Sequence, residues 1–498
     1  MKRDWARAAV LAAIVALGLL LRLYHVRDPI LDHPGWRQGD QAAIARNFAL
    51  LENNLFRPQV DYDGPPPNYI ELELQIVPFA AAQLDRAFGV HVIFGRLIVI
   101  GFSLLAVLAL YAFAADLFSP RAGLLAAFLY AVAPGAVYYG RTFTPDSVMV
   151  CCSVAALWLW WRWQLRRRSW DFGLAVIVGA LAWLAKPPAL LVFAPLLAIV
   201  FARRGVRAFA DWSVYAFALL TLVPFVAYLR YVHGIAEWHW VSGITSLHVL
   251  PHLVAELSGV HPLLAGVQST LALLRVLAGS ILGPALFAFA VVGAFAPWRG
   301  EHQRERAWML WAWFLALAAY TFVVVDVERV DYYLLPWLPL AVLVAAGGLD
   351  GAWERFGAAA PRPAVWIGLA AAAFVTVYVG MLQIHAYYTW SRPVYSAATE
   401  LDRVLAPGSL IVMGHYDPSV LYLINRKGWE EDPLVWNVHD MTSAIAKGAR
   451  YFVAVEVPRF KANRSLNAFM QRYRRVSVSS GWQVYDMRHF AKSTKRKS

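Results

Sequence analysis

Long apolar runs, separated by short polar or charged stretches, make up most of the chain. They lie near residues 8–23, 92–115, 121–138, 144–163, 172–187, 188–203, 212–232, 279–297, 307–326, 331–348 and 364–384. About 20 apolar residues in a helix cross the hydrocarbon core of a bilayer. Because lipid offers the backbone no hydrogen-bond partners, runs of this length are expected to be helices. The pattern therefore predicts an α-helical polytopic membrane protein with about eleven transmembrane helices.

The composition agrees with this pattern. Of the 498 residues, 60% are hydrophobic and 15% are charged, which is too little charge to cover a soluble protein of this length. The formal net charge is +13, but most basic residues lie in short loops between the predicted spans, where membrane orientation requires them. We therefore expect membrane lipids as partners, and no nucleic acid. The two cysteines, Cys151 and Cys152, are adjacent in an apolar run, which indicates small buried side chains rather than a disulfide framework.

The basic loops also indicate the orientation. If the N-terminus is cytoplasmic, the stretches on the inner side are the start of the chain, 116–121, 162–171, 202–211, 298–306 and 349–363. Three of these stretches carry arginine clusters, in agreement with the positive-inside rule. No small-residue cleavage site follows the first apolar run, so we expect a retained helix rather than a signal peptide.

Three larger pieces then fall on the outer side, namely the loops 26–91 and 233–278 and the tail 385–498. This arrangement requires the apolar stretch 69–88, which contains three acids, to lie at the interface as a helix rather than to span. In the tail, short strands are predicted at 410–413, 451–455 and 482–485, with helical segments near 394–405 and 464–472. The sequence therefore predicts a transmembrane domain over 1–384 and a small extracytoplasmic α/β domain over 385–498.

Charged residues at the outer ends of spans are the candidates for chemistry, because charge next to a span is costly. Asp40 lies near the start of a helix that we expect to begin near Gly39, and Asp146 follows Pro145 at the start of a later span. Either acid could be only a helix cap. Lys186, between two spans, could bind a phosphate or carboxylate, or could only extend to the lipid phosphates.

Other polar residues of the outer side carry weaker signals. Glu71 and Glu73 are two residues apart on the expected interface helix, so at most one should enter the same site. Tyr332 and Tyr333 belong to an outer-edge cluster, although tyrosines at an interface are usually anchors. The spacing of the histidines in the second outer loop matches no standard zinc pattern, and we interpret them mostly as loop residues. These histidines are His233, His239, His248, His252 and His261.

Taken together, these residues put acids and cations at the outer ends of neighbouring spans. An acid there can take the proton of an acceptor hydroxyl, and a cation there can stabilise a leaving phosphate. No Gly-rich phosphate loop occurs in the sequence, which suits a lipid rather than a nucleotide as leaving group. The combination indicates group transfer from a lipid-linked phosphate donor.

Several motifs resemble those of one known superfamily. They are Trp36-Arg37-Gln38 with Asp40, Ala45-Arg46-Asn47-Phe48, Gly140-Arg141 with Pro145-Asp146, Lys186-Pro187, and Tyr332-Tyr333-Leu334-Leu335-Pro336. With these motifs, roughly residues 1 to 350 resemble the GT-C superfamily of polyprenyl-phosphate-dependent glycosyltransferases. The most similar branch is the bacterial one related to protein O-mannosyltransferases and to the lipid A aminoarabinose transferase. Two positions depart from the pattern: Gly39-Asp40 stands where the family often has Asp-Glu, and Gly64 stands where that branch has a Lys before paired prolines.

The resemblance implies an inverting glycosyltransferase of the bacterial inner membrane, with a sugar on polyprenyl phosphate as donor. By this resemblance, Asp40 corresponds to the catalytic base. Asp146 and Glu73 correspond to acids that position the sugar or hold the base in place. The lipid phosphate would be bound by Lys186 and Arg141. Remaining contacts to substrate are expected from Arg37, Tyr332 and Tyr333. The resemblance leaves a divalent metal open and implies no metal ligand.

Two other classes of protein stay open at this point. A polysaccharide ligase or polymerase would share the helices and the lipid donor but would transfer a whole glycan. A transporter would carry ionisable residues at mid-span and discontinuous paired helices, whereas the predicted spans are nearly free of charge. The sequence specifies neither the sugar nor the acceptor, which could be a lipid, a glycan or a protein.

Overall fold

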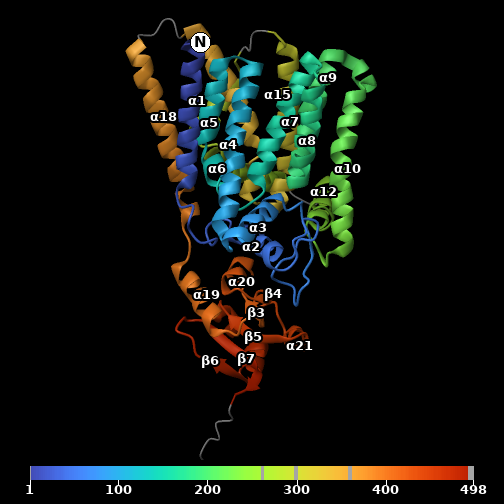
Figure 1. Cartoon of the computed structure of the whole chain (residues 1–498), viewed down its shortest axis with the longest axis vertical. Coiled ribbons are helices and arrows are strands. Elements are labelled where there is room, and N and C mark those ends of the chain that lie inside the picture. The colour runs from blue at the N-terminus through green and yellow to red at the C-terminus, as the bar shows by residue number, and fades with distance from the viewer. Residues whose placement is uncertain (1, 259–262, 297–300, 357–361, 492–498) are drawn as a thin grey trace, which may run out of the picture.

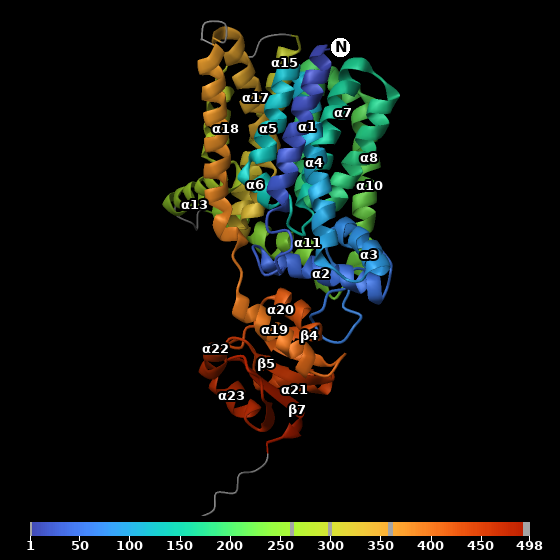
Figure 2. The same cartoon turned by 60° about the vertical axis from the view of Figure 1, so that its left-hand side comes forward.

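The computed structural model describes residues 2–258, 263–296, 301–356 and 362–491. Long helices form a bundle, and the N-terminus lies at the end of the bundle that is remote from the rest of the chain (Figure 1). Across the other end lie the helices α2 (Gly35–Leu50) and α3 (Ile76–Phe88). A domain containing a β-sheet follows beyond this layer, as Figure 2 shows from a second side.

The bundle helices largely follow the predicted apolar runs. Their bounds are α1 Lys2–Leu23, α4 Val92–Leu117, α5 Pro120–Val132, α7 Asp146–Arg166, α8 Ser169–Ala185, α9 Phe193–Arg204, α10 Trp212–Ile235, α13 Leu263–Val276, α14 Pro284–Ala294, α15 Gln303–Tyr320, α17 Trp337–Phe356 and α18 Arg362–Ile384. Within the described residues, six helices are long and apolar enough to cross a membrane, or seven if one bent pair counts as a span. The chain is thus a multi-pass membrane protein, and the larger number of about eleven spans stays a prediction.

Prolines and glycines interrupt several of the predicted spans. The run 121–138 breaks before Pro134, which begins the short helix α6 (Pro134–Tyr138). The run 279–297 is half of a bent pair, Ser269–Ile281 and Pro284–Ala294, with an angle of 111° between the two helices. Gly283 at the bend has φ +79, a conformation that glycine adopts readily, and Pro284 cannot continue a helical hydrogen-bond ladder.

The structure corrects the expected interface helix over 69–88. The helix α3 begins only at Ile76, and the residues from 69 to 75 are not helical. Residues Ile70–Glu71 form the short strand β1, which pairs in parallel with β2 (Trp238–His239) of the second outer loop. Glu71 therefore lies on a strand and Glu73 in the irregular segment after it, and neither lies on a helix.

The C-terminal part contains a five-stranded sheet in the order β4-β3-β5-β7-β6. Its strands are β3 Leu410–Gly414, β4 Lys427–Glu430, β5 Ala449–Ala454, β6 Tyr473–Val476 and β7 Gln483–Phe490. The pairs of β3 with β4 and β5 are parallel, and those of β7 with β5 and β6 are antiparallel. Strands β3, β5 and β7 lie where the sequence predicts short strands. The helices of this part are α19 Arg392–Val404, α20 Pro418–Ile424, α21 Val438–Ala446, α22 Val457–Ala462 and α23 Arg464–Met470.

This C-terminal part packs directly on α2. A Cβ atom built on Gly39 would lie 2.6 Å from the Cα and N atoms of Ser419 in α20, so only glycine allows the approach. Nearby, the buried Asp61 accepts hydrogen bonds from Arg46 of α2 and from Lys427 of β4. Burial acts to raise the pKa of Asp61, but these two cations outweigh it and hold the pKa below its ordinary value.

We predict that Gly39→Ala loosens this contact. The added methyl group has no space against the Ser419 backbone, and overpacking of this kind costs about 1–3 kcal/mol. Thermal unfolding of the purified protein in detergent should shift to lower temperature. Gly101→Ala is the matched control, because a Cβ at Gly101 of α4 meets nothing within 4 Å. Equal unfolding temperatures for the two variants would contradict the close approach.

Candidate active site

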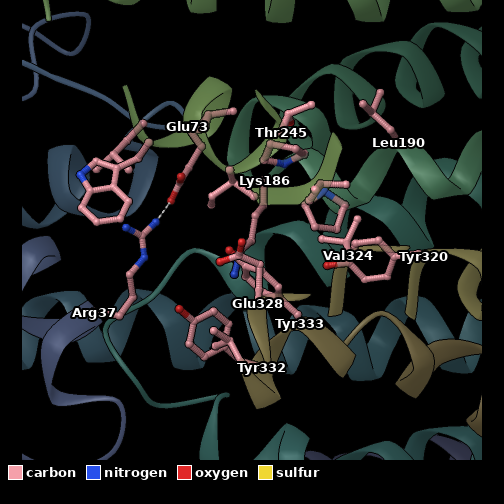
Figure 3. A pocket seen from close by; sticks show the side chains of 18 of the residues that line it. Arg37, Glu73, Lys186, Leu190, Thr245, Tyr320, Val324, Glu328, Tyr332 and Tyr333 are labelled. Atoms are coloured by element: carbon pink, nitrogen blue, oxygen red, sulfur yellow. Dashed lines mark hydrogen bonds and ion pairs between the residues drawn. The ribbon is translucent and has the colours of Figure 1, made fainter. Parts of the chain in front are cut away.

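A cavity of about 370 Å³ opens where the bundle meets the α2 layer. Figure 3 shows its two ends: Arg37 and Glu73 lie on one side, Lys186 and Tyr332 near the middle, and Leu190 on the far side. The far end is mainly apolar. Besides Leu190, the apolar side chains that line the cavity include Leu191, Val241, Ile244, Val249 and Val324. The cavity therefore offers a polar region for a charged group and an apolar region for hydrocarbon.

Helix α2 contributes the acid and the cation of the polar end. Arg37 and Asp40 are one turn apart, with the Arg37 Nη1 and Asp40 Oδ2 atoms separated by 4.0 Å. Arg37 also forms an ion pair with Glu73. Because α2 begins at Gly35 after Pro34, Asp40 lies in its second turn, and the expectation that it starts a helix near Gly39 is wrong. Asp40 is therefore not a cap residue.

Asp40 is buried yet incompletely bonded. Its side chain is 2% exposed, and its Oδ1 atom has no hydrogen-bond partner within the described part of the chain. Burial raises the pKa of Asp40 to about 7, while Arg37 opposes the rise and Asp417 of the C-terminal part adds to it. A carboxyl group of this pKa can exchange a proton near neutral pH.

Lys186 and Asp146 form a buried ion pair. The Lys186 ammonium donates to Asp146 Oδ1 at 2.6 Å, and both side chains are at least 94% buried. The ammonium also lies over the rings of Tyr332 and Tyr333, 4.4 and 5.1 Å from their centroids. Burial lowers the pKa of Lys186, and Asp146 counteracts this effect. Lys186 thus has an anionic partner and does not extend to the lipid phosphates.

Asp146 reaches this position because it is the first residue of α7, after Pro145. Its Oδ1 atom accepts from Lys186, and its Oδ2 atom is buried without a partner among the described residues. Lys186 follows α8, where Pro187 prevents the helix from continuing. The end of α8 and the start of α7 therefore bring Lys186 and Asp146 together, and Lys186 lines the cavity.

The position of Arg141 differs from the expectation. Arg141 is fully buried, forms an ion pair with Asp32, and stacks on the ring of Tyr388 at 4.6 Å. Arg96 of α4 donates to the same Asp32 carboxylate at 2.9 Å. Arg141 does not belong to the cavity wall formed by the described residues. Arg141 therefore forms a structural ion pair in this structure, and its expected contact with a lipid phosphate stays a prediction.

Through Gln38, Asp32 is connected to α2 and to the turn before α7. The Gln38 amide donates to Asp32 Oδ1 at 2.7 Å, and its oxygen accepts from the Phe143 amide at 3.2 Å. Gln38 lies on α2 next to Arg37, and Phe143 lies in the turn before α7. Sequence reasoning missed Asp32. A signal was present, because Arg96 lies inside a predicted span and requires a buried partner.

Of the two glutamates of the first loop, at most one was expected to enter the site. Glu73 lines the cavity, whereas Glu71 is bonded outside it to His233 and Ser242. The structure also adds Glu328 to the cavity wall, where His248 lies 2.8 Å from it. Glu328 was not predicted, although it precedes the outer-edge cluster that contains Tyr332 and Tyr333.

Within the described residues, one group of side chains has the geometry to hold a metal ion: Glu71, His233 and His239. It lies outside the cavity. The two acids of the cavity's polar end, Asp40 and Glu73, are instead arranged around Arg37.

Comparisons with known proteins agree with the fold. A family model for dolichyl-phosphate-mannose-protein mannosyltransferase matches residues 76–231. The structure is similar to that of ArnT from Cupriavidus metallidurans in the apo state, with a TM-score of 0.65, 16% identity, and coverage of 96% of this chain and 98% of that chain. ArnT from the same organism, bound to undecaprenyl phosphate, gives a TM-score of 0.63, 15% identity, and coverage of 97% and 98%.

An archaeal structure has the same fold. The oligosaccharyltransferase AglB from Archaeoglobus fulgidus, in complex with an inhibitory peptide and a dolichol-phosphate, gives a TM-score of 0.59 and 14% identity, covering 99% of this chain and 75% of that chain. A sequence search of curated proteins finds no significant match. The family model and the fold confirm the predicted resemblance to the GT-C superfamily.

We predict that the Lys186–Asp146 pair is strongly coupled. Lys186→Met or Asp146→Asn alone leaves a buried group without its partner and should cost about 3–5 kcal/mol of stability. The double variant should lose less than the sum of the two single losses. Thermal unfolding in detergent measures this double-mutant cycle.

A parallel cycle on the exposed pair of Arg57 and Glu52, whose side chains are 44% and 29% exposed, is the control. It should show a coupling of about 0–1 kcal/mol. Additive effects at Lys186 and Asp146 would contradict the ion pair.

Proposed function

We propose that this protein of GT-C fold is an inverting glycosyltransferase, which moves a sugar from polyprenyl phosphate to an acceptor hydroxyl. The observation that carries the proposal is a cavity in which Asp40, a buried cation and an apolar wall occur together. A base, a phosphate-binding cation and a surface for the lipid chain are the groups that this reaction requires.

Lys186 is the residue that we assign to the donor phosphate. Its ammonium has three N–H donors, and one of them bonds Asp146. The other N–H groups can donate to phosphate oxygens in the cavity, where burial strengthens the electrostatic attraction. The rings of Tyr332 and Tyr333 also contact the ammonium and help to hold it in place. The lipid chain would continue along the apolar end near Leu190.

Asp40 is the residue that we assign to the base. Its carboxylate accepts the proton of the acceptor hydroxyl, the bond from the acceptor oxygen to the anomeric carbon forms, and the bond from that carbon to the phosphate oxygen breaks. Attack from the face opposite the phosphate inverts the anomeric centre. Arg37 lies between Asp40 and Glu73 and fixes the base in position.

We further propose that the cavity opens on the extracytoplasmic side of the bacterial inner membrane. It lies at the end of the bundle opposite the N-terminus (Figure 1), and the arginine-rich ends of α7 and α9 lie on the N-terminal side. Residues 1–384 would then be the transmembrane catalytic domain, and residues 385–498 an extracytoplasmic α/β domain. The bent pair α13 and α14 contributes no described residue to the cavity wall, which gives no support to a transporter.

Transfer of a whole lipid-linked glycan is the second candidate. Its support is the similarity in fold to AglB, which is named an oligosaccharyltransferase. The mass that is added to the acceptor distinguishes the two candidates, because one sugar residue and a complete glycan differ in mass. Mass spectrometry of envelope glycans and lipids from cells with and without the protein measures it.

We predict that Asp40→Asn greatly lowers the rate of transfer while the protein still folds. Loss of the base should lower the rate by about 10²–10⁴-fold, measured as product in membranes that contain equal amounts of each variant. Asp63→Asn is the control, because Asp63 is a first-loop carboxyl outside the cavity wall, and burial likewise raises its pKa to about 7. Full activity of Asp40→Asn would remove Asp40 from the mechanism.

The raised pKa of Asp40 predicts the pH dependence. The base must be ionised to accept a proton, so kcat/KM should rise with pH up to about 7 and level off above it. Below that value, each unit of pH should lower kcat/KM about tenfold. A rate profile over this range tests the assignment. If kcat/KM of the Asp40→Asn variant still rose with pH over the same range, the rise would have to be assigned to another group.

A further inference from the structure

Asp331, which the proposed mechanism does not use, accepts hydrogen bonds from several distant segments of the chain. Its Oδ1 atom accepts from the Tyr139 hydroxyl at 2.7 Å, and its Oδ2 atom accepts from the Tyr387 hydroxyl at 2.6 Å. The Nε2 atom of His33 lies 3.2 Å from both oxygens, a contact that requires a proton on this nitrogen. Three side chains therefore converge on one carboxylate.

The three donors are brought together by the fold. His33 lies in the first outer loop, Tyr139 directly follows α6, and Tyr387 belongs to the short helix η7 that follows the last bundle helix. The Asp331 side chain is only 14% exposed. Burial acts to raise the pKa of Asp331, but the hydrogen bonds from His33, Tyr387 and Tyr139 outweigh it and hold the pKa below its ordinary value. The carboxylate is therefore ionised near neutral pH.

Asp331 fixes the next residue, Tyr332, in two ways. Its Oδ1 atom accepts from the Tyr332 amide at 2.8 Å. The ring of Tyr139, which is held by the same oxygen, meets the ring of Tyr332 edge-on with centroids 6.0 Å apart. Tyr332 lines the cavity, and the Lys186 ammonium lies 4.4 Å from its ring (Figure 3). The carboxylate therefore influences the position of Lys186 through one aromatic ring.

The same carboxylate is connected to the helix that carries Asp40. The His33 ring contacts Asp331, and the His33 backbone is fixed on both sides. Its amide donates to the Tyr387 carbonyl at 3.1 Å, and its carbonyl accepts from the Tyr138 hydroxyl at 2.5 Å. Helix α2 begins two residues after His33 and carries Asp40 in its second turn. Asp331 thus lies between the part of the site that holds Lys186 and the part that holds Asp40.

We propose that Asp331 is a positioning residue for glycosyl transfer, which holds Tyr332 and Lys186 in a fixed position relative to Asp40. Among the described residues it does not belong to the cavity wall, so it acts through Tyr332 rather than on the substrate. A misplacement of about 1 Å between reacting groups can lower a rate by about 10²-fold. This role rests on the proposed function, because it requires that Lys186 binds the donor phosphate.

The test measures equilibrium binding of radiolabelled undecaprenyl phosphate to the purified full-length protein in detergent. Asp331→Asn keeps the size of the side chain, but an amide nitrogen cannot accept from Tyr387 or His33. Binding should weaken about tenfold, as expected when a desolvated contact between a cation and a ring is lost. Tyr387→Phe removes one donor and leaves the bond to the Tyr332 amide, so its loss should be smaller.

A double-mutant cycle separates positioning from a general loss of structure. Tyr332→Leu removes the ring through which Asp331 is proposed to act. Asp331→Asn should then weaken binding no further when it is added to Tyr332→Leu. In transfer assays, kcat/KM of Asp331→Asn should fall by about 10²-fold. It should still rise with pH up to about 7, because Asp40 is intact.

Asp211→Asn is the matched control. Asp211 is also a buried carboxylate with several partners, since it accepts from Ser213 and pairs with Arg204. It precedes α10 at the end of the bundle remote from the cavity (Figure 1). This variant should lower the temperature of thermal unfolding and leave the affinity for undecaprenyl phosphate unchanged.

The outcomes distinguish this role from the proposed function. Equal affinity in wild type and Asp331→Asn, or additive losses with Tyr332→Leu, would overturn the positioning role and leave the proposed function in place. An equal loss of affinity in Asp211→Asn would also overturn it, because destabilisation alone would then explain the effect. Wild-type protein that does not bind undecaprenyl phosphate would overturn the proposed function and the positioning role with it.

Discussion

Charge that is buried at one end of an apolar bundle has to be paired, and the arrangement of this site follows from that requirement. The Lys186–Asp146 pair joins the end of α8 to the start of α7, and Arg37 joins α2 to the segment between β1 and α3 that contains Glu73. Removing water makes each pair strong, and it makes an unpaired partner expensive. The helix ends are therefore held in one relative position, which leaves the cavity preformed between them.

Much of the fold could be predicted from the sequence, because long apolar runs permit only helices in lipid. The interruptions were missed where a single residue decides the local geometry, as at Pro134 and Gly283. The start of α2 was also misplaced, since Trp36 and Arg37 do not resemble an apolar helical start. Local pattern alone does not reveal that these polar residues are buried against other segments.

The candidate site was predictable to the extent that a residue's role depends on its type and its place at a span end. Lys186 and Asp146 meet as pairing requires, although the sequence did not indicate that they pair with each other. Arg141 was assigned to phosphate because Asp32, its actual partner, is more than a hundred residues away. The grouping of Glu71 with two histidines was missed for the same reason. Contacts between distant segments depend on tertiary packing, which spacing along the chain does not encode.

The packing of the C-terminal part on α2 determines whether the chain can be truncated. Ile44 and Phe48 of α2 share one hydrophobic core with Leu421 and Ile424 of α20. A truncated chain that ended after the last bundle helix would leave this apolar face open to water. Helix α2 and the C-terminal part thus depend on each other for burial of this core, and neither is a detachable module.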